Sequence, residues 1–261
     1  MRIYTVTHKA FNPPKDDLYV PIQVGKQFSG KDLGFISDDT GDNIAHKNKN
    51  YCELTALYWI WKNDHSDVVG LCHYRRYFVP DGMFTGERNR LNRRQIEKLL
   101  SRYDAIVADK ITWECSVRES YSRGEGKDKD FEKTREIIAR DYPQYLCAFD
   151  KVANGSSASY CNMIITKKSL LDRYCEWLFD VLEKVENATD LTDYTPQQAR
   201  IYGYLSEILL NVWLEHNEIA IREVPVVITE LPLKARVSYR VKKVIKNFLK
   251  EKAAILFVNK R

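Results

Sequence analysis

The sequence predicts an α/β protein with a mostly parallel central sheet flanked by helices. Segments rich in β-branched and aromatic residues alternate with segments whose apolar residues recur at helical spacing, which is the pattern of strand–helix–strand units. The composition, with 44% hydrophobic and 30% charged residues, is that of a globular protein. No internal repeat or low-complexity linker is present. The simplest division is one domain, residues 1–230, followed by a basic segment, residues 231–261.

The first elements alternate strand, helix and strand. Residues 2–8 (RIYTVTH) are β-branched and aromatic, which predicts a strand, and a region rich in Pro and Gly follows. From residue 50 the apolar residues recur at helical spacing, and Asn50 with Glu53 three residues later resembles a capping box. Residues 67–74 (DVVGLCHY) return to a strand.

The remaining elements continue the alternation with longer helices. In chain order we predict a helix at 92–103, a strand at 104–109, a helical region at 130–155 that breaks near Pro143, a strand at 159–168, helices at 169–186 and 195–217, and a strand at 220–230. Strands that alternate with helices in this way build a largely parallel sheet with helices on its faces.

The positive charge of the chain is concentrated at its C-terminal end. Residues 231–261 contain ten Lys or Arg and one acid, a net charge of +9, which leaves −4 for residues 1–230 out of a total of +5. The apolar residues of this segment share one face of a predicted helix, and the cations occupy the rest. Such a helix binds anionic membrane surfaces, with about 1 kcal/mol per cation. The alternative is that its apolar face packs on the domain. We expect no nucleic-acid partner, because the body is acidic and carries no nucleic-acid motif.

The rest of the composition predicts a cytoplasmic protein. The N-terminal residues MRIYTVTHK do not read as a signal peptide, and no run approaches the ~20 apolar residues of a membrane span. The six cysteines are scattered singly, which is typical of reduced thiols. With the basic segment, these features predict a protein that is peripheral on the inner face of the plasma membrane.

Several classes of chemistry lack their motifs. The chain has no Walker loop, GxGxxG, HExxH, GxSxG or kinase signature. The loop SDDTGDN offers Asp38, Asp39 and Asp42 as oxygen ligands for Mg²⁺ or Mn²⁺. The same residues are also good turn formers, and we favour the turn.

Several segments resemble a bacterial family of capsular or exopolysaccharide biosynthesis proteins. These segments are YVPIQVG, DDTGDNIAHKNKNYCELTALYWIWKN, VGLCHYRRYF, and YCNMIITKKSLLDRYCEWLFDVL with QQARIYGYLSEILLNVWLEHN. Members of that family are glycosyltransferases with a GT-A-like domain, and some are galactofuranosyltransferases. The resemblance covers about residues 1–230 and thins between residues 112 and 129, where we expect an acceptor-facing loop. It implies transfer from a UDP-sugar, with galactofuranose expected, to a lipid-linked glycan acceptor in surface-polysaccharide synthesis.

The family resemblance focuses attention on the stretch HYRRYF. GT-A enzymes usually carry a metal-binding DxD motif after a strand that follows a helix, whereas here two arginines stand in that place. Two guanidinium groups can neutralise a diphosphate without a metal ion. We expect Arg75 and Arg76, together with His73 and Tyr74, to bind the donor, and therefore no metal. Because alternate side chains of a strand point oppositely, the alternative is that one arginine pairs with a structural carboxylate.

The remaining candidates follow from strand ends and from one helix. Glu207 lies where inverting GT-A enzymes carry the carboxylate that deprotonates the acceptor; the alternative is an exposed turn or an ion pair with Arg200. Asn162 either holds sugar hydroxyls or is a buried amide bonded to backbone. Glu53 is explained as a helix cap. The expected nucleotide-sugar contacts at the end of the first strand and in the acidic loop are Thr7, His8, Lys9, Asp42 and Asn43.

Two other functions stay open at this point. One is a Mg²⁺-dependent nucleotide-sugar hydrolase or nucleotidyltransferase that uses the acidic loop. The other is a non-enzymatic scaffold that binds the membrane through residues 231–261.

Overall fold

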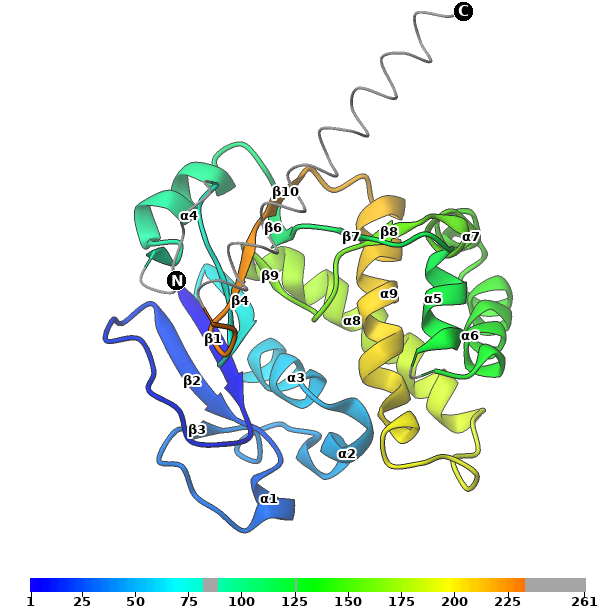
Figure 1. Cartoon of the computed structure of the whole chain (residues 1–261), viewed down its shortest axis with the longest axis horizontal. Coiled ribbons are helices and arrows are strands. Elements are labelled where there is room, and N and C mark those ends of the chain that lie inside the picture. The colour runs from blue at the N-terminus through cyan, green and yellow to red at the C-terminus, as the bar shows by residue number, and fades with distance from the viewer. Residues whose placement is uncertain (82–88, 125, 233–261) are drawn as a thin grey trace, which may run out of the picture. The chain divides into compact units, whose positions relative to one another are not determined.

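The structure, a computed structural model, describes residues 1–81, 89–124 and 126–232 in two compact units (Figure 1). The first unit comprises the described residues within 1–74 and 92–223, and the second comprises those within 75–91 and 224–232. The division predicted at residue 230 stays a prediction.

The first unit is built on a mixed, mostly parallel sheet with the strand order β10-β6-β9-β4-β1-β2-β3. Strand β1 pairs in parallel with β2 and β4, β2 pairs in parallel with β3, and β9 is antiparallel to both β4 and β6. The strands are β1 Arg2–Thr7, β2 Tyr19–Gln23, β3 Ile36–Ser37, β4 Val68–His73, β6 Ala105–Ala108, β9 Ile164–Lys167 and β10 Ile221–Val224. The predicted fold class, a helix-flanked and mostly parallel sheet, is confirmed.

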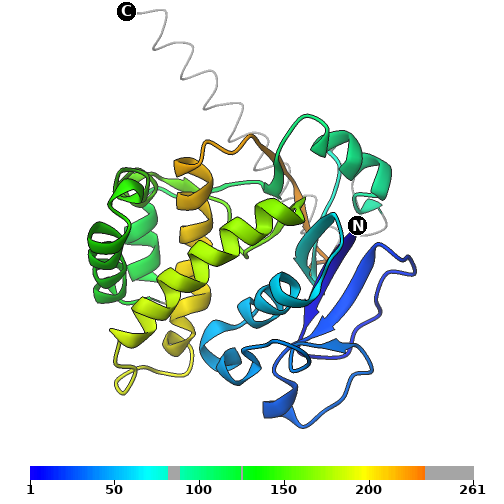
Figure 2. The same ribbon diagram turned by 180° about the vertical axis from the view of Figure 1, so that it is seen from behind.

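Helices cover the sheet. Helix α8 lies along β4 and β9 beside α3, and α9 packs between α8 and α7 (Figures 1 and 2). The helices of the first unit are α1 Lys26–Ser29, α2 Asn48–Tyr51, α3 Leu54–Asn63, α4 Arg93–Leu100, α5 Val117–Arg123, α6 Asp128–Asp141, α7 Leu146–Asn154, α8 Lys168–Asn187 and α9 Ile201–His216. Two short strands, β7 Ile111–Thr112 and β8 Ser157–Ala158, form a separate antiparallel pair.

The core fixes α9, the helix that carries the main site. Almost every side chain of α9 is buried, and its Trp213 packs against Tyr174 of α8 with ring centroids 5.4 Å apart. Burying large aromatic side chains contributes about 1.5–3 kcal/mol each. A helix held on so many sides presents its few polar residues in fixed directions.

Five local predictions are wrong. The strand predicted at 159–168 begins as β9 only at Ile164, because residues 161 and 162 form a turn with left-handed φ. Asn50 and Glu53 form no capping box, because Asn50 lies inside α2 and Glu53 is itself the residue before α3; the Asn50 amide donates to the carbonyl of Ala199. The expected acceptor-facing loop contains helix α5. The helix predicted at 195–217 starts as α9 only at Ile201. The strand predicted at 220–230 divides at Pro225, which has no N–H for a ladder hydrogen bond, into β10 and β11 Val226–Ile228.

The second unit contains β5 Arg76–Phe78, which pairs with β11 in antiparallel register. Tyr77, Phe78 and Val79 are buried. Most of the predicted basic amphipathic helix, residues 233–261, lies outside the described residues. In the part of the chain that the structure describes, no helix is both long enough and apolar enough to cross a membrane.

Candidate active site

The turn before β9 has a strained backbone. Cys161 and Asn162 have φ of 69° and 50°, the left-handed region. Non-glycine residues held there cost about 1–3 kcal/mol each, and such strain is found most often at functional sites. Asn211 of α9 fixes the start of the turn: the Ser159 N–H donates to Asn211 Oδ1 at 2.9 Å, and Asn211 Nδ2 donates to the Ser159 carbonyl at 2.8 Å. The turn is thus tied to α9.

Two carboxylates meet this turn from different helices. Glu207 of α9 accepts the Cys161 N–H at Oε1, at 2.8 Å. Glu53, directly before α3, accepts Nδ2 of Asn162 at Oε1, also at 2.8 Å. Both glutamates are partly exposed. Hydrogen bonds from the turn therefore orient both carboxylates, and solvent can still reach them. A carboxylate that transfers a proton requires both conditions.

The amide of Asn162 is buried, with 2% of the residue exposed. Its Nδ2 also points at Ser206 Oγ, 2.9 Å away, and the Ser206 hydroxyl donates to the Gly203 carbonyl at 2.7 Å. Asn162 Oδ1 is buried and accepts no hydrogen bond from the described residues. The amide therefore orients the Glu53 carboxylate. Its Nδ2 also lies 3.5 Å from the Gly203 carbonyl, so the amide bonds both to side chains and to backbone, and the two alternatives for Asn162 stay open.

His73 joins the same turn from the sheet. It is the last residue of β4, and its Nε2 lies 2.7 Å from the Cys161 carbonyl oxygen. Because a carbonyl can only accept, Nε2 carries the proton of this hydrogen bond. The carboxyl ends of parallel strands are where ligands bind in α/β sheets. The predicted His73, Asn162 and Glu207 are thus brought together, and Glu53 is added to them.

The corner between α2 and α3 closes onto the start of α9. Cys52 at this corner has φ of 53°, and its Sγ accepts from Arg200 Nε at 3.1 Å. Burial raises the pKa of the Cys52 thiol to about 11, and the charge of Glu53 adds to this. A Cβ on Gly203 would lie 3.3 Å from Cys52 Sγ, so glycine permits the close approach. Arg200 contacts Cys52 in this arrangement.

An aromatic pair lies beside the carboxylates. Tyr160, in the same turn, packs edge-to-face on Trp113 with ring centroids 4.8 Å apart. Burial first, and then the charge of Glu207, raise the pKa of Tyr160. Trp113 belongs to the segment where the family resemblance thins. The two rings offer an apolar surface close to the Glu207 carboxylate.

The end of β1 forms a second cluster with the end of β4. Thr7 closes its own turn: its hydroxyl donates to the Lys9 carbonyl at 2.5 Å and accepts the Lys9 N–H at 3.2 Å. His8 stands edge-to-face on Tyr74 at 5.7 Å, Phe11 lies 5.9 Å from the same ring, and Lys9 Nζ is 5.1 Å from its centroid. The four predicted donor contacts at these strand ends are therefore neighbours.

The acidic loop adopts the favoured turn. Asn63 brackets Asp42, accepting its N–H at 3.1 Å and donating to its carbonyl at 2.8 Å, and Tyr58 donates to the Asp42 carboxylate at 3.2 Å. Asn43 Oδ1 accepts the Ala45 N–H at 3.2 Å. Both predicted residues thus stabilise the loop itself.

Asp38 differs from the exposed residues of the acidic loop in its burial. It is fully buried, Thr55 donates to its Oδ2 at 2.5 Å, and burial raises the pKa of its carboxyl to about 6. Across residues 1–81, 89–124 and 126–232, the structure groups no three His, Cys, Asp or Glu side chains that could hold a metal ion.

Arg75 and Arg76 begin the second unit. Arg75 Nη1 lies 3.1 Å from Glu230 Oε2 in a partly exposed ion pair, as the structural alternative anticipated. Arg76 is the first residue of β5 and pairs with Ile228. Surface pairs of this kind contribute about 0–1 kcal/mol to stability, so the ion pair with Glu230 holds Arg75 only weakly.

Sequence reasoning missed three residues of the site: Cys52, Ser206 and Asn211. It named Arg200 only as a possible partner of Glu207, whereas Arg200 contacts Cys52. One signal for two of the three missed residues was present in the sequence. Ser206 and Asn211, with Glu207, are the central polar residues of a helix that is otherwise apolar on every side. A buried helix retains polar residues where they have hydrogen-bond partners.

Comparisons with known proteins agree with this fold. The chain matches the solved structure of WbbM, a bifunctional glycosyltransferase in its apo form, with a TM-score of 0.81 and 29% sequence identity over 88% of this chain. The match covers 45% of the WbbM chain, so this protein spans about half the length of that structure. No curated protein matched the sequence. The family model for the domain of unknown function DUF4422 matches residues 2–218, and the chain therefore belongs to the DUF4422 family.

Proposed function

We propose that this protein is a glycosyltransferase that moves a sugar from a nucleotide-sugar donor to a glycan acceptor. The likeness to WbbM in fold and sequence supports the reaction class. The observation that carries the proposal is the Cys161–Asn162 turn, where Glu207 and Glu53 are held beside His73 at the carboxyl end of β4.

The reaction is a single displacement. Glu207 takes the proton of the acceptor hydroxyl as the hydroxyl oxygen forms its bond to the anomeric carbon. The bond from that carbon to the diphosphate breaks, and its electron pair leaves with the phosphate oxygen. The Cys161 N–H holds the Glu207 carboxylate in one orientation. General base catalysis of this kind contributes about 10²–10⁴-fold. Asn162 and its hydrogen bond to Glu53 keep the second carboxylate in place.

The donor binds at the ends of β1 and β4. Thr7, His8, Lys9 and Tyr74 face the nucleotide there, and the clustering of their side chains supports this role. Asp42 and Asn43 shape the neighbouring loop. Two further residues, Arg75 and Arg76, are assigned on the sequence alone to neutralise the departing diphosphate, which makes the reaction independent of a metal ion.

The finer identity of the substrates comes from the sequence resemblance. The donor is a UDP-sugar, with galactofuranose as the sugar, and the acceptor is a lipid-linked glycan of surface-polysaccharide synthesis. The net charge of +9 on residues 231–261 supports attachment to the anionic inner face of the plasma membrane.

A panel of UDP-sugars tests this function. The full chain is incubated with each UDP-sugar, with and without EDTA, and UDP release and UDP binding are measured. We expect release from one donor, UDP-galactofuranose, and no effect of EDTA. Loss of all activity in EDTA would favour the Mg²⁺-dependent hydrolase or nucleotidyltransferase that uses Asp38, Asp39 and Asp42. Absence of UDP binding at millimolar concentration would leave the scaffold function.

A further inference from the structure

A pocket of about 500 Å³ lies in the first unit, between α7, the C-terminal half of α9 and the start of β10. Its volume falls within the range of about 300–1,000 Å³ that is typical of small-molecule sites. None of the residues predicted from the sequence lines it.

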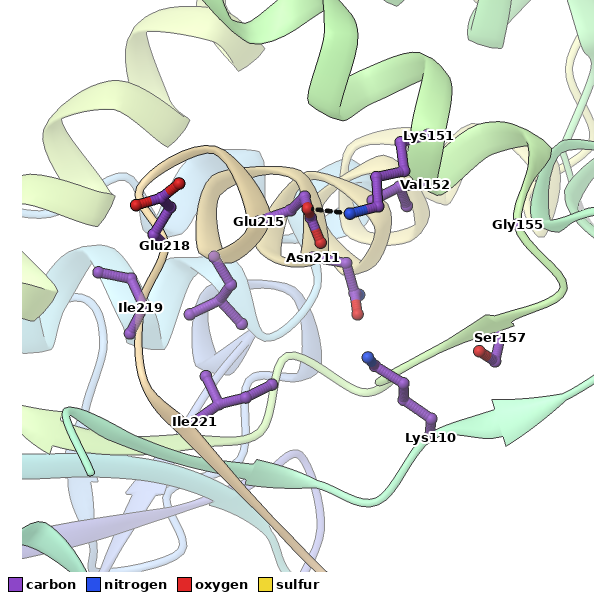
Figure 3. Close-up of a pocket in the computed structure, with 11 residues that line it drawn as sticks. Lys110, Lys151, Val152, Gly155, Ser157, Asn211, Glu215, Glu218, Ile219 and Ile221 are labelled. Atoms are coloured by element: carbon purple, nitrogen blue, oxygen red, sulfur yellow. Dashed lines mark hydrogen bonds and ion pairs between the residues drawn. The ribbon is translucent and has the colours of Figure 1, made fainter. Parts of the chain in front are cut away.

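Apart from Glu218, which lies next to Ile219, one side of the pocket is apolar and the other is mostly polar (Figure 3). Figure 3 shows Ile219 and Ile221 on one side, and Lys110 and Ser157 on the other, with Asn211 between them. A surface that is apolar on one side and rich in hydrogen-bonding groups on the other matches a sugar ring. The C–H face of the ring packs on the apolar side, and its hydroxyls bond to the polar side.

The charges of the lining compensate each other. Lys151 forms an ion pair with Glu215 across the top of the pocket (Figure 3). Lys110 Nζ lies 3.4 Å from Glu223 Oε1. A pocket built for phosphate would carry unbalanced positive charge. Paired cations and carboxylates instead offer donors and acceptors together, which suits a neutral polyhydroxylated ligand.

One helix connects the pocket to the carboxylate base. Asn211, a lining residue, donates to the Glu207 carbonyl at 2.8 Å and fixes the Ser159 end of the catalytic turn. Asn211 and Glu215 lie one and two turns beyond Glu207 on α9, which is about 6 and 12 Å along the axis. A ligand in the pocket therefore sits within the reach of a short glycan whose terminal hydroxyl is at Glu207.

We propose that this pocket is an acceptor subsite that binds a neutral sugar unit of the acceptor glycan, one or more units away from the hydroxyl that is glycosylated. This assignment rests on the proposed transferase function for its biological meaning. Lys110, Glu215 and Ser157 bond to the hydroxyls of this unit, and Ile219 and Ile221 pack against its ring.

Ligand-observed NMR on the full chain tests the subsite without knowledge of the natural acceptor. The probes are neutral methyl hexosides and disaccharides in the pyranose and furanose forms, with inorganic phosphate as the charged comparison. We expect saturation transfer to at least one neutral saccharide. We expect binding at least about fivefold weaker in Lys110→Ala combined with Glu215→Ala, because the variant loses two charged hydrogen-bonding groups of the pocket. The matched control, Lys133→Ala with Glu136→Ala, removes an exposed pair on α6 and should bind as the wild type.

The outcomes separate the subsite from the transferase function. Saccharide binding that is unchanged in the pocket variant, binding of phosphate alone, or no saccharide binding at all would each overturn the subsite. The melting temperature of each variant shows whether it is folded. If the Lys110→Ala, Glu215→Ala double variant is not folded, Lys151→Ala is tested in its place. UDP binding is measured in parallel on the same samples. If the wild-type protein binds saccharide but does not bind UDP, the transferase function is contradicted and the pocket assignment is still supported.

Discussion

Replacement of Asn162 by Asp probes the contact that holds the second carboxylate. Asn162 Nδ2 donates to Glu53 Oε1 at 2.8 Å, and the amide is buried. Asn162→Asp keeps the shape and the tolerance of a left-handed φ, but it faces Glu53 with a second carboxylate. At this distance two charges in an effective dielectric of 20 repel by about 6 kcal/mol. The pair therefore holds one proton between them in the folded variant.

The stability of this variant should depend on pH in a defined direction. The folded variant retains a proton that the unfolded chain releases near its ordinary carboxyl pKa of about 4. Its free energy of unfolding, relative to the wild type, should therefore fall by about 1.4 kcal/mol for each unit of rising pH. Between pH 5 and pH 8 the loss is about 4 kcal/mol, or about 8–16 °C in melting temperature.

Thermal unfolding of both proteins at pH 5, 6, 7 and 8 measures this loss. Asn154→Asp, at an exposed position at the end of α7, is the matched control and should follow the wild type at every pH. A difference between Asn162→Asp and the wild type that stays constant from pH 5 to pH 8 would refute the direct contact between the amide and the Glu53 carboxylate.

Three further predictions concern Asp38, the cysteines and the arginines. The folded pKa of Asp38 is raised to about 6, so its contribution to stability is present below about pH 4 and is lost as pH rises through 6. In urea unfolding, Asp38→Asn should match the wild type at pH 4 and exceed it at pH 7 by about 3 kcal/mol. With iodoacetamide at pH 8, peptide mapping should find exposed Cys147 modified well before Cys52, whose thiol pKa is about 11; equal rates would contradict the buried corner at the start of α9. Arg76→Ala should weaken UDP binding at least about tenfold in calorimetry, as expected for the loss of a charge-assisted contact, and unchanged affinity would remove Arg76 from the donor site.

The fold class could be predicted because local patterns carry it. The run VVGLCH reads as a buried strand, and the apolar spacing of α8 reads as a helix that covers a sheet. Strand β2 escaped prediction because Pro21, which lies opposite Thr5 in the sheet, breaks the usual signal of a strand within a region already rich in Pro and Gly.

The candidate site was predicted in part. His73 and Asn162 could be chosen because they lie on predicted strands, and Glu207 because of its place in the family resemblance. The role of Glu53 could not, since its partner Asn162 is 109 residues away and the contact depends on two left-handed residues. The spacing of Asn50 and Glu53 satisfied a local rule, but Asn50 bonds to Ala199, 149 residues away. Contacts between distant segments are set by the tertiary fold and leave no local pattern.

Replacement of Glu207 by Gln tests the central claim most directly. The measurement is sugar transfer by the full chain under saturating donor, with UDP binding determined on the same samples and Glu176→Gln, an exposed residue of α8, as the control. We predict that Glu207→Gln lowers kcat by about 10²–10⁴-fold with UDP affinity unchanged, because only the base is removed. Full turnover in Glu207→Gln would contradict the account.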